Sequence, residues 1–364
     1  ETALVGIART MVLWRAITDG EDRIAIGTHN HLYILENDAL YDITPLRKTT
    51  SNLTNPLKTT DESTTIIVTD NSHGAISGDF VVINSAAAIG GITAATLNQS
   101  EGYQITVLTA NTYSITVSSA ATSTVAAGGG TTIDIKYLIG VAAGLGQQSG
   151  DPALGWGTGS WGGSTWGTAR STDSSDVKLS NSQWSLNLWG EDLIATVRGG
   201  AIYYYDTSSS PNRAVLVSSL AGATSVPTTT TLTTISFPDR HVLALGTDPL
   251  SSSGNIDPMQ VRWSDQEDFA VWAPTVTNTA GDQRLEVGTK IVSATTSKDE
   301  TVIATDEALY GMTFVGPPFI FSFRLLATNC GSAGKNVMMT VDSTVFWMGR
   351  SNFFVYDGIV KELP

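Results

Sequence analysis

Residues 190–206 read GEDLIATVRGGAIYYYD, and this stretch contains the pattern that decides the fold. A charged turn leads into a hydrophobic strand, a Gly-rich turn follows, and an aromatic strand ends in Asp. Similar units lie at 20–45 (GEDRIAIGTHNHLYILENDALYDITP), 239–274, 298–326 and 341–357. Repetition of one strand–turn–strand unit is typical of β-propeller blades. The chain is therefore predicted to be all-β with a propeller-like body, and its function is sought on surfaces and channels.

The spacing of the units predicts an insertion. Their first strands contain Ile24, Ile194, Val242, Val302 and Val345, and the last four are 48, 60 and 43 positions apart. Propeller blades are about 40–50 residues long, so the gap of 170 positions between the first two is too long for one blade. We assign 1–60 and 138–364 to a discontinuous body, which we expect to be incomplete at its C-terminus.

The interrupting segments differ in character. Residues 61–137 predict a small all-β module, a barrel or a sandwich, because Tyr113, Ile115 and Val117 alternate on one strand face. Residues 140–181 form a Gly-rich loop in which Trp156, Trp161 and Trp166 recur every five residues. So much Gly disfavours helix and strand. The indoles either anchor the loop by packing or are exposed for recognition.

Composition narrows the functional classes. Of the 364 residues, 15% are charged, against about 25% in typical domains. The sequence contains no stretch of about 18 apolar residues, so it predicts no membrane span. The net charge of −14 disfavours a protein that grips nucleic acid, but it suits a conduit through which DNA slides. The single cysteine, Cys330, reads as a spare or buried thiol rather than a nucleophile.

Motifs for catalysis and metal binding are incomplete. Gly157, Gly159 and Gly162 have the spacing of the GxGxxG fingerprint of dinucleotide-binding proteins. That fingerprint requires a strand before it and a helix after it, and the flanking sequence predicts neither. His29 and His31 have no third zinc ligand at a useful interval, so we interpret them as turn and blade-surface residues. We find no nucleophile elbow, P-loop, HExxH or CxxC. The sequence predicts no enzyme activity, no catalytic residue, no metal site and no cofactor.

Acidic residues cluster in two predicted turns. Asp265, Glu267 and Asp268 form one group, and Asp306 and Glu307 belong to the other. Glycosidases use paired carboxylates about 5–10 Å apart, but Asp in turns more often caps the backbone. We favour solvated turns, which would also form an acidic wall or interface if they face a channel.

Four segments together resemble the tail nozzle proteins of short-tailed bacteriophages, also called tail tubular protein B-like proteins. They are YDITPLR at 41–47, the GWGTGSWGGSTWG loop at 155–167, SQWSLNLWGEDLIA at 182–195 and FFVYDGIVKELP at 353–364. The module at 61–137 looks like small inserts of phage tail proteins, through ISGDFV, IGGI and ANTYSIT. The resemblance implies a virion protein of the tail that forms a homohexameric ring below the adaptor. Its implied partners are portal-side adaptor proteins, tail fibre or spike proteins, and genomic DNA in transit without sequence-specific binding.

Three functions follow as hypotheses. The first is a ring subunit that continues and gates the DNA ejection channel, with Gly150–Arg170 as the candidate gate loop. The second is a propeller-type tail adhesin that binds glycans by stacking sugars on Trp156, Trp161 and Trp166. The third, a glycoside hydrolase, requires a carboxyl group with a raised pKa in a central pocket, and no acidic pair stands out.

Overall fold

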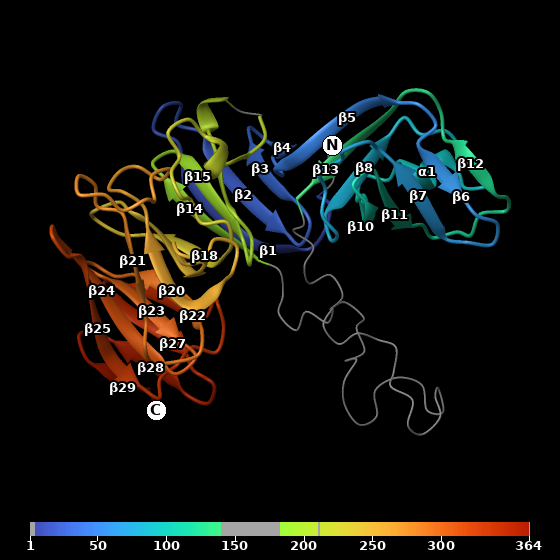
Figure 1. Ribbon diagram of the computed structural model, residues 1–364. Coiled ribbons are helices and arrows are strands. Elements are labelled where there is room, and N and C mark those ends of the chain that lie inside the picture. Colours follow the sequence, from blue (N-terminus) through green and yellow to red (C-terminus); the bar gives the residue numbers. More distant parts are fainter. Residues whose placement is uncertain (1–3, 140–182, 210–211, 364) are drawn as a thin grey trace, which may run out of the picture. The chain divides into compact units, whose positions relative to one another are not determined.

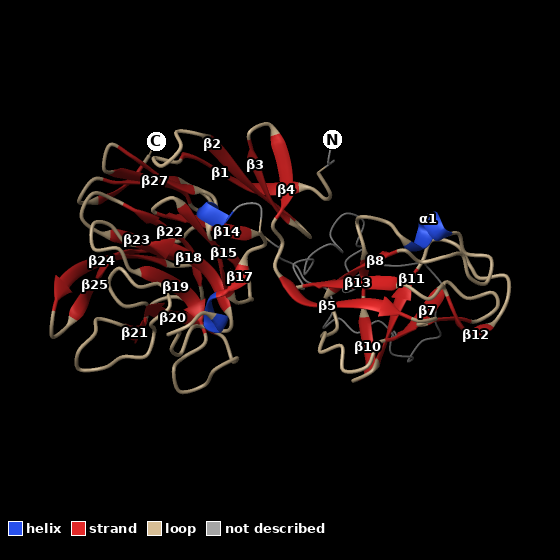
Figure 2. Cartoon of the chain, turned by 90° about the horizontal axis from the view of Figure 1, so that it is seen from above, coloured by secondary structure: helices blue, strands red, loops and turns tan. Residues whose placement is uncertain are grey.

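The structure is a computed structural model that describes residues 4–139, 183–209 and 212–363. These residues are almost entirely β (Figures 1 and 2), with one four-residue α-helix, α1 (Ala94–Leu97). The strands form small antiparallel sheets, as the sequence predicts, and within the described ranges no sheet closes into a barrel. The chain divides into two compact units, one of Glu1–Arg9 and Ile26–Gln183, the other of Thr10–Ala25 and Trp184–Pro364.

Two sheets build most of the first unit and share one hydrophobic core. One sheet has the strand order β5-β13-β8-β9 and the other β10-β11-β7-β6-β12. Their bounds are β5 Leu46–Leu53, β6 Leu57–Thr59, β7 Thr65–Thr69, β8 Phe80–Asn84, β9 Tyr103–Gln104, β10 Thr106–Thr109, β11 Thr112–Thr116, β12 Val125–Gly128 and β13 Ile133–Leu138. Tyr113 and Ile115 alternate into this core as the sequence pattern indicates, and Val117 joins them. The core already includes Leu57, so the module draws on strands that the sequence analysis placed in the body.

A further sheet, of order β1-β2-β3-β4, has strands in both units. Its strands are β1 Ala8–Arg15, β2 Asp22–Thr28, β3 Leu32–Glu36 and β4 Ala39–Asp42. Within the second unit, β1 lies beside β14 (Trp184–Trp189). The Thr10 hydroxyl donates to the Trp184 carbonyl oxygen at 3.1 Å, and Trp14 Nε1 donates to the Glu191 carbonyl oxygen at 3.0 Å.

Four more sheets follow one another in the second unit, each with four strands in chain order. The colours from yellow-green to red trace this series in Figure 1. The remaining strands are β15 Asp192–Val197, β16 Ile202–Tyr205, β17 Val215–Leu216, β18 Thr230–Ile235, β19 Val242–Thr247, β20 Asp257–Trp263, β21 Gly281–Arg284, β22 Ile291–Thr296, β23 Thr301–Thr305, β24 Ala308–Gly316, β25 Ile320–Thr328, β26 Met338–Val341, β27 Thr344–Met348, β28 Phe353–Tyr356 and β29 Val360–Glu362.

Face-to-face packing stacks these sheets. In β19, Val242 and Ala244 enter the core shared with β15 and β16, whereas Leu243 and Leu245 enter the core shared with β22 to β25. Successive side chains of a strand point to opposite faces, so a continuous apolar run such as VLAL buries both faces of its sheet. β23 repeats this arrangement, with Ile303 on one side and Val302 and Ala304 on the other. Stacked four-stranded sheets of this kind are propeller-like.

Polar bonds join the first strands of neighbouring sheets. Asn187 Nδ2 on β14 donates to the Thr233 carbonyl oxygen on β18 at 3.1 Å. The Thr296 hydroxyl on β22 donates to the Ile235 carbonyl oxygen on β18 at 3.0 Å, and Thr295 bonds Thr340 on β26 at 3.0 Å between hydroxyls. The first strands therefore lie side by side at one edge of the stack, and their hydroxyl and amide side chains satisfy backbone groups there.

The repeat units of the sequence correspond to the inner pairs of strands in these sheets. Ile194, Val242, Val302 and Val345 lie on β15, β19, β23 and β27, which are second strands rather than first. The repeat units of the sequence leave out the preceding strand of each sheet. In β18 (TTLTTI) and β22 (IVSATT) this strand is rich in Thr and Ser and therefore has no apolar pattern.

Candidate functional site: polar networks and end faces of the second unit

The acidic turn after β20 caps its own backbone. Asp265 Oδ1 accepts hydrogen bonds from the Thr279 amide at 2.8 Å, the Thr279 hydroxyl at 2.6 Å and the Gln266 amide at 2.9 Å. Burial alone would raise the pKa of Asp265, but these bonds outweigh it and lower the pKa. Asp268 accepts from the Ala270 amide at 2.9 Å. Glu267 is exposed, with its carboxylate 3.9 Å from Arg240.

The second acidic turn joins β23 to β24. Asp306 accepts hydrogen bonds from the Thr289 hydroxyl at 2.5 Å and the Thr289 amide at 2.8 Å. Burial opposes ionisation of Asp306, yet these bonds lower its pKa. Glu307 is exposed. Neighbouring strands are antiparallel, so β20 runs in the same direction as β18, whereas β23 runs opposite to β22. Because β18 and β22 end side by side, the last residues of β20 and of β23 lie at opposite ends of the strands. The structure therefore does not bring the two acidic groups together.

The other residues singled out from the sequence have different positions. Trp156, Trp161 and Trp166 lie outside the described residues, as does the glycine fingerprint. His29 and His31 are buried in the turn between β2 and β3. His29 Nδ1 accepts from the Ile7 amide at 2.8 Å, and the ring of His31 stacks on Tyr33. Among the described residues, no group of three His, Cys, Asp or Glu side chains is placed to hold a metal ion.

An acid–histidine–hydroxyl chain escaped the sequence analysis. His241 Nδ1 lies 2.8 Å from Asp239 Oδ2, and His241 Nε2 lies 3.0 Å from Thr279 Oγ1. The order resembles a catalytic triad, in which a base activates a hydroxyl. Here the Thr279 hydroxyl donates its proton to Asp265, and the imidazole is buried against Phe321. The geometry suits a structural bridge and leaves no free nucleophile. The only local signal for it is the DRH sequence at 239–241.

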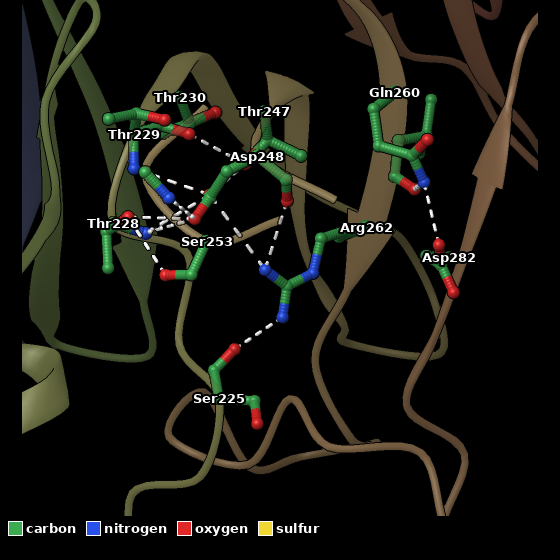
Figure 3. A network of polar contacts seen from close by, with 12 residues as sticks. Ser225, Thr228, Thr229, Thr230, Thr247, Asp248, Ser253, Gln260, Arg262 and Asp282 are labelled. Carbon is green, nitrogen blue, oxygen red and sulfur yellow. Dashed lines mark hydrogen bonds and ion pairs between the residues drawn. The ribbon is translucent and has the colours of Figure 1, made fainter. Parts of the chain in front are cut away.

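A second network surrounds Asp248, which is fully buried at the end of β19 (Figure 3). Its carboxylate accepts from the Thr228 hydroxyl at 2.8 Å, the Gly254 amide at 2.9 Å and the Thr247 hydroxyl at 3.2 Å. Burial would raise the pKa of Asp248, but the bonds from Gly254 and Thr228 reverse the effect and lower it. A carboxyl group with a lowered pKa and saturated oxygens is unsuited to act as a general acid.

Arg262 completes this network from β20 (Figure 3). Its Nη1 donates to the Asp248 carbonyl oxygen at 3.2 Å and lies 3.9 Å from the carboxylate, and Nη2 donates to the Ser225 carbonyl oxygen. The guanidinium is 6.0 Å from the ring centre of buried Trp272. Arg262 thus ties the loop at 225–228 to two strands of its sheet. The bonds span 14 and 37 positions of sequence, so no local pattern reveals them.

Apolar side chains are exposed on the two outermost faces of the series. On the last sheet, residues that point away from the buried core include Met339, Val341 and Phe353, which are 59%, 45% and 59% exposed. On β1, Met11 and Leu13 are 68% and 62% exposed. The alternate residues Trp14 and Trp347 are buried on the opposite faces. Neighbouring exposed apolar residues on one sheet face mark a candidate interaction surface.

No model of a protein family matches the chain, and no curated protein sequence matches it. The solved structures that are similar to this chain include the following two. The phage phi92 endosialidase is 11% identical with a TM-score of 0.28, covering 94% of this chain and 51% of that chain. The extracellular domain of a hybrid two component system from B. thetaiotaomicron is 12% identical with a TM-score of 0.30, covering 94% and 50%. This chain thus spans about half the length of each, and similarities this low carry no argument about its activity. Within the described ranges, no helix is long and apolar enough to cross a membrane.

Proposed function

We propose that this protein is a structural subunit that assembles with further copies of itself, as a nozzle ring in a short phage tail. The observation that carries the proposal is the pair of exposed apolar faces at the two ends of the stacked series. Between these ends, faces with the same alternation are buried against neighbouring sheets, as Leu243 and Ile303 illustrate. The last sheet presents Met339, Val341 and Phe353 to solvent instead.

Burial of these faces would supply the driving force for association. Fully burying one large apolar side chain contributes about 1.5–3 kcal/mol, so burial of Met11 and Leu13 on one face and of Met339 and Phe353 on the other favours contact. We assign the last sheet of one copy to the first sheet of the next, which is a head-to-tail contact. Head-to-tail contacts between identical chains close into rings when the rotation permits.

The rest of the proposal comes from charge and from the sequence resemblance. A net charge of −14 favours a channel wall that repels DNA phosphates rather than binding them. The saturated networks around Asp248 and His241 support a structural rather than a catalytic role for these buried polar groups. Adaptor proteins above the ring and fibre or spike proteins around it are the partners that the resemblance suggests, and 150–170 is the proposed gate segment.

Mass photometry of the purified chain tests the association. We expect oligomers at micromolar concentration for the wild type, and monomers for the double variant Met339→Glu/Phe353→Glu. The pair Met11→Glu/Leu13→Glu on the other face should give the same result. Val276→Glu is the matched control, because Val276 is fully exposed on a loop away from both faces. A wild-type chain that stays monomeric, or variants that assemble like the wild type, would contradict the proposed interface.

A further inference from the structure

Lys335 lies in the loop between β25 and β26, where it is half-buried. Its Nζ donates to the Trp184 carbonyl oxygen on β14 at 3.0 Å. An ammonium group has three N–H donors, and this is the one bond that Nζ makes among the described residues. The Trp184 oxygen also accepts from the Thr10 hydroxyl, so it is shared. Lys335 therefore holds two further donors near the beginning of β14.

A second cation lies at the same place. Trp184 pairs with Val197 across the β14–β15 ladder, so Arg198 directly follows the residue opposite Trp184. Arg198 is half-buried. Burial lowers the pKa of Lys335, and the nearby charge of Arg198 lowers it further, to about 7. The two cations therefore repel each other in a poorly solvated position.

No carboxylate in the described part of the chain balances this charge. Neither Lys335 nor Arg198 forms an ion pair there, whereas buried Arg23 pairs with Asp19 and buried Arg262 approaches Asp248. The backbone amides of Gly334, Lys335 and Asn336 also have no hydrogen-bond partner among the described residues. Two cations near the beginning of β14, and three successive amides in the loop that contains Lys335, thus have hydrogen-bond donors without a partner among the described residues.

We propose that Lys335, Arg198 and the amides of 334–336 bind an oxyanion of the phosphate type, either free or as part of a nucleic-acid backbone. A guanidinium and an ammonium form strong charge-assisted hydrogen bonds with such oxygens, and successive backbone amides commonly line anion sites. The bound anion supplies the negative charge that no described carboxylate provides beside Lys335 and Arg198. The site does not depend on whether the chain assembles into a ring.

Sulfate is the probe of choice, because it keeps its double charge from pH 5 to 9 while the lysine titrates. Calorimetric titration should show one sulfate per chain at pH 6. Lys335→Gln and Arg198→Gln should each weaken binding by about tenfold or more, since each removes a charge-assisted contact. Lys298→Gln is the control, because Lys298 is exposed in the turn between β22 and β23. Equal affinity in all four proteins, or no binding by the wild type at millimolar sulfate, would overturn the proposal.

Chemical reactivity gives a readout on the folded wild type. Acetylation at pH 7.5, followed by mass spectrometry, should modify Lys335 faster than exposed lysines if its amine is partly neutral there. Sulfate should protect Lys335 and leave Lys298 unaffected, and absence of protection would count against the site. An oligothymidylate that competes with sulfate identifies a nucleic-acid phosphate as the source. If sulfate binds and the oligonucleotide does not compete, the ligand is a free oxyanion.

Discussion

The buried ring of His241 links two carboxylate-bearing turns: its Nδ1 lies 2.8 Å from Asp239 Oδ2, and its Nε2 lies 3.0 Å from Thr279 Oγ1. The Thr279 hydroxyl in turn donates to Asp265 Oδ1 at 2.6 Å. The carboxylates of Asp239 and Asp265 therefore lie at the two ends of one chain of polar contacts through His241 and Thr279.

Removing the Thr279 hydroxyl should destabilise the fold. Thr279→Val removes the hydroxyl that contacts buried His241 Nε2 and donates to Asp265, which should cost about 1–3 kcal/mol, whereas Thr279→Ser keeps the hydroxyl and should cost less. Thr277→Val, an exposed change in the same loop, is the control. Urea unfolding at pH 7 measures the differences. Equal unfolding midpoints for Thr279→Val and Thr277→Val would contradict a stabilising role for the contact between His241 and Thr279.

Acid should unfold the protein through its capped carboxylates. The pKa values of Asp239, Asp248, Asp265 and Asp306 are all lowered in the folded state, mainly by hydrogen bonds that overcome burial. Groups with a lowered folded pKa contribute stability above the unfolded value of about 3.9, and this contribution is lost as pH falls through the folded pKa. Thermal melts should therefore show a steep loss of Tm below about pH 4. Asp248→Asn should flatten that slope, and an unchanged slope would exclude Asp248 as a contributor.

Arg262 should contribute far more to stability than an exposed arginine. Arg262→Met leaves the buried Asp248 carbonyl oxygen without this donor and the buried Asp248 carboxylate without its nearest cation, so we expect a loss of about 3–5 kcal/mol. Arg284→Met is the matched control, because Arg284 pairs with Asp257 at 2.7 Å but is 58% exposed at its side chain. The control should cost at most about 1 kcal/mol. Chemical denaturation of both variants decides whether the Arg262 network holds the loop at 225–228.

Trp156, Trp161 and Trp166 give the sharpest test of the adhesin hypothesis. If they bind glycans, sugar should quench their fluorescence in a saturable way, because sugar faces stack on indoles. The buried tryptophans Trp184, Trp272 and Trp347 should not respond. Replacing the three loop tryptophans by Phe should abolish any quenching. Fluorescence that no sugar in a glycan panel changes would remove the adhesin hypothesis.

The all-β class and the repeating unit could be predicted from the sequence because both depend on local signals. Continuous apolar runs such as VLAL at 242–245 mark strands that are buried on both faces, and charged or Gly-rich turns separate them. The first strands β18 and β22 were missed, since Thr233 and Thr296 form polar bridges between sheets and produce no apolar pattern.

The buried networks could not be predicted for a different reason. Lys335 and Trp184 are 151 positions apart, and Arg262 and Ser225 are 37 apart, so only the folded chain brings them together. The two acidic segments form turns, as the sequence indicates. That they lie at opposite ends of the strands depends on strand direction, which the sequence pattern does not give. The exposed apolar faces could not be predicted either, because they depend on which sheets are first and last in the stacked series.

Cryo-electron microscopy of phage particles that carry this protein is the sharpest test of whether it forms the tail nozzle. We predict a closed ring of copies on the tail axis, with the face containing Met339 and Phe353 buried against the next copy and a DNA-width channel inside. Density for this chain only at the tail periphery, or none in the particle, would contradict the nozzle proposal.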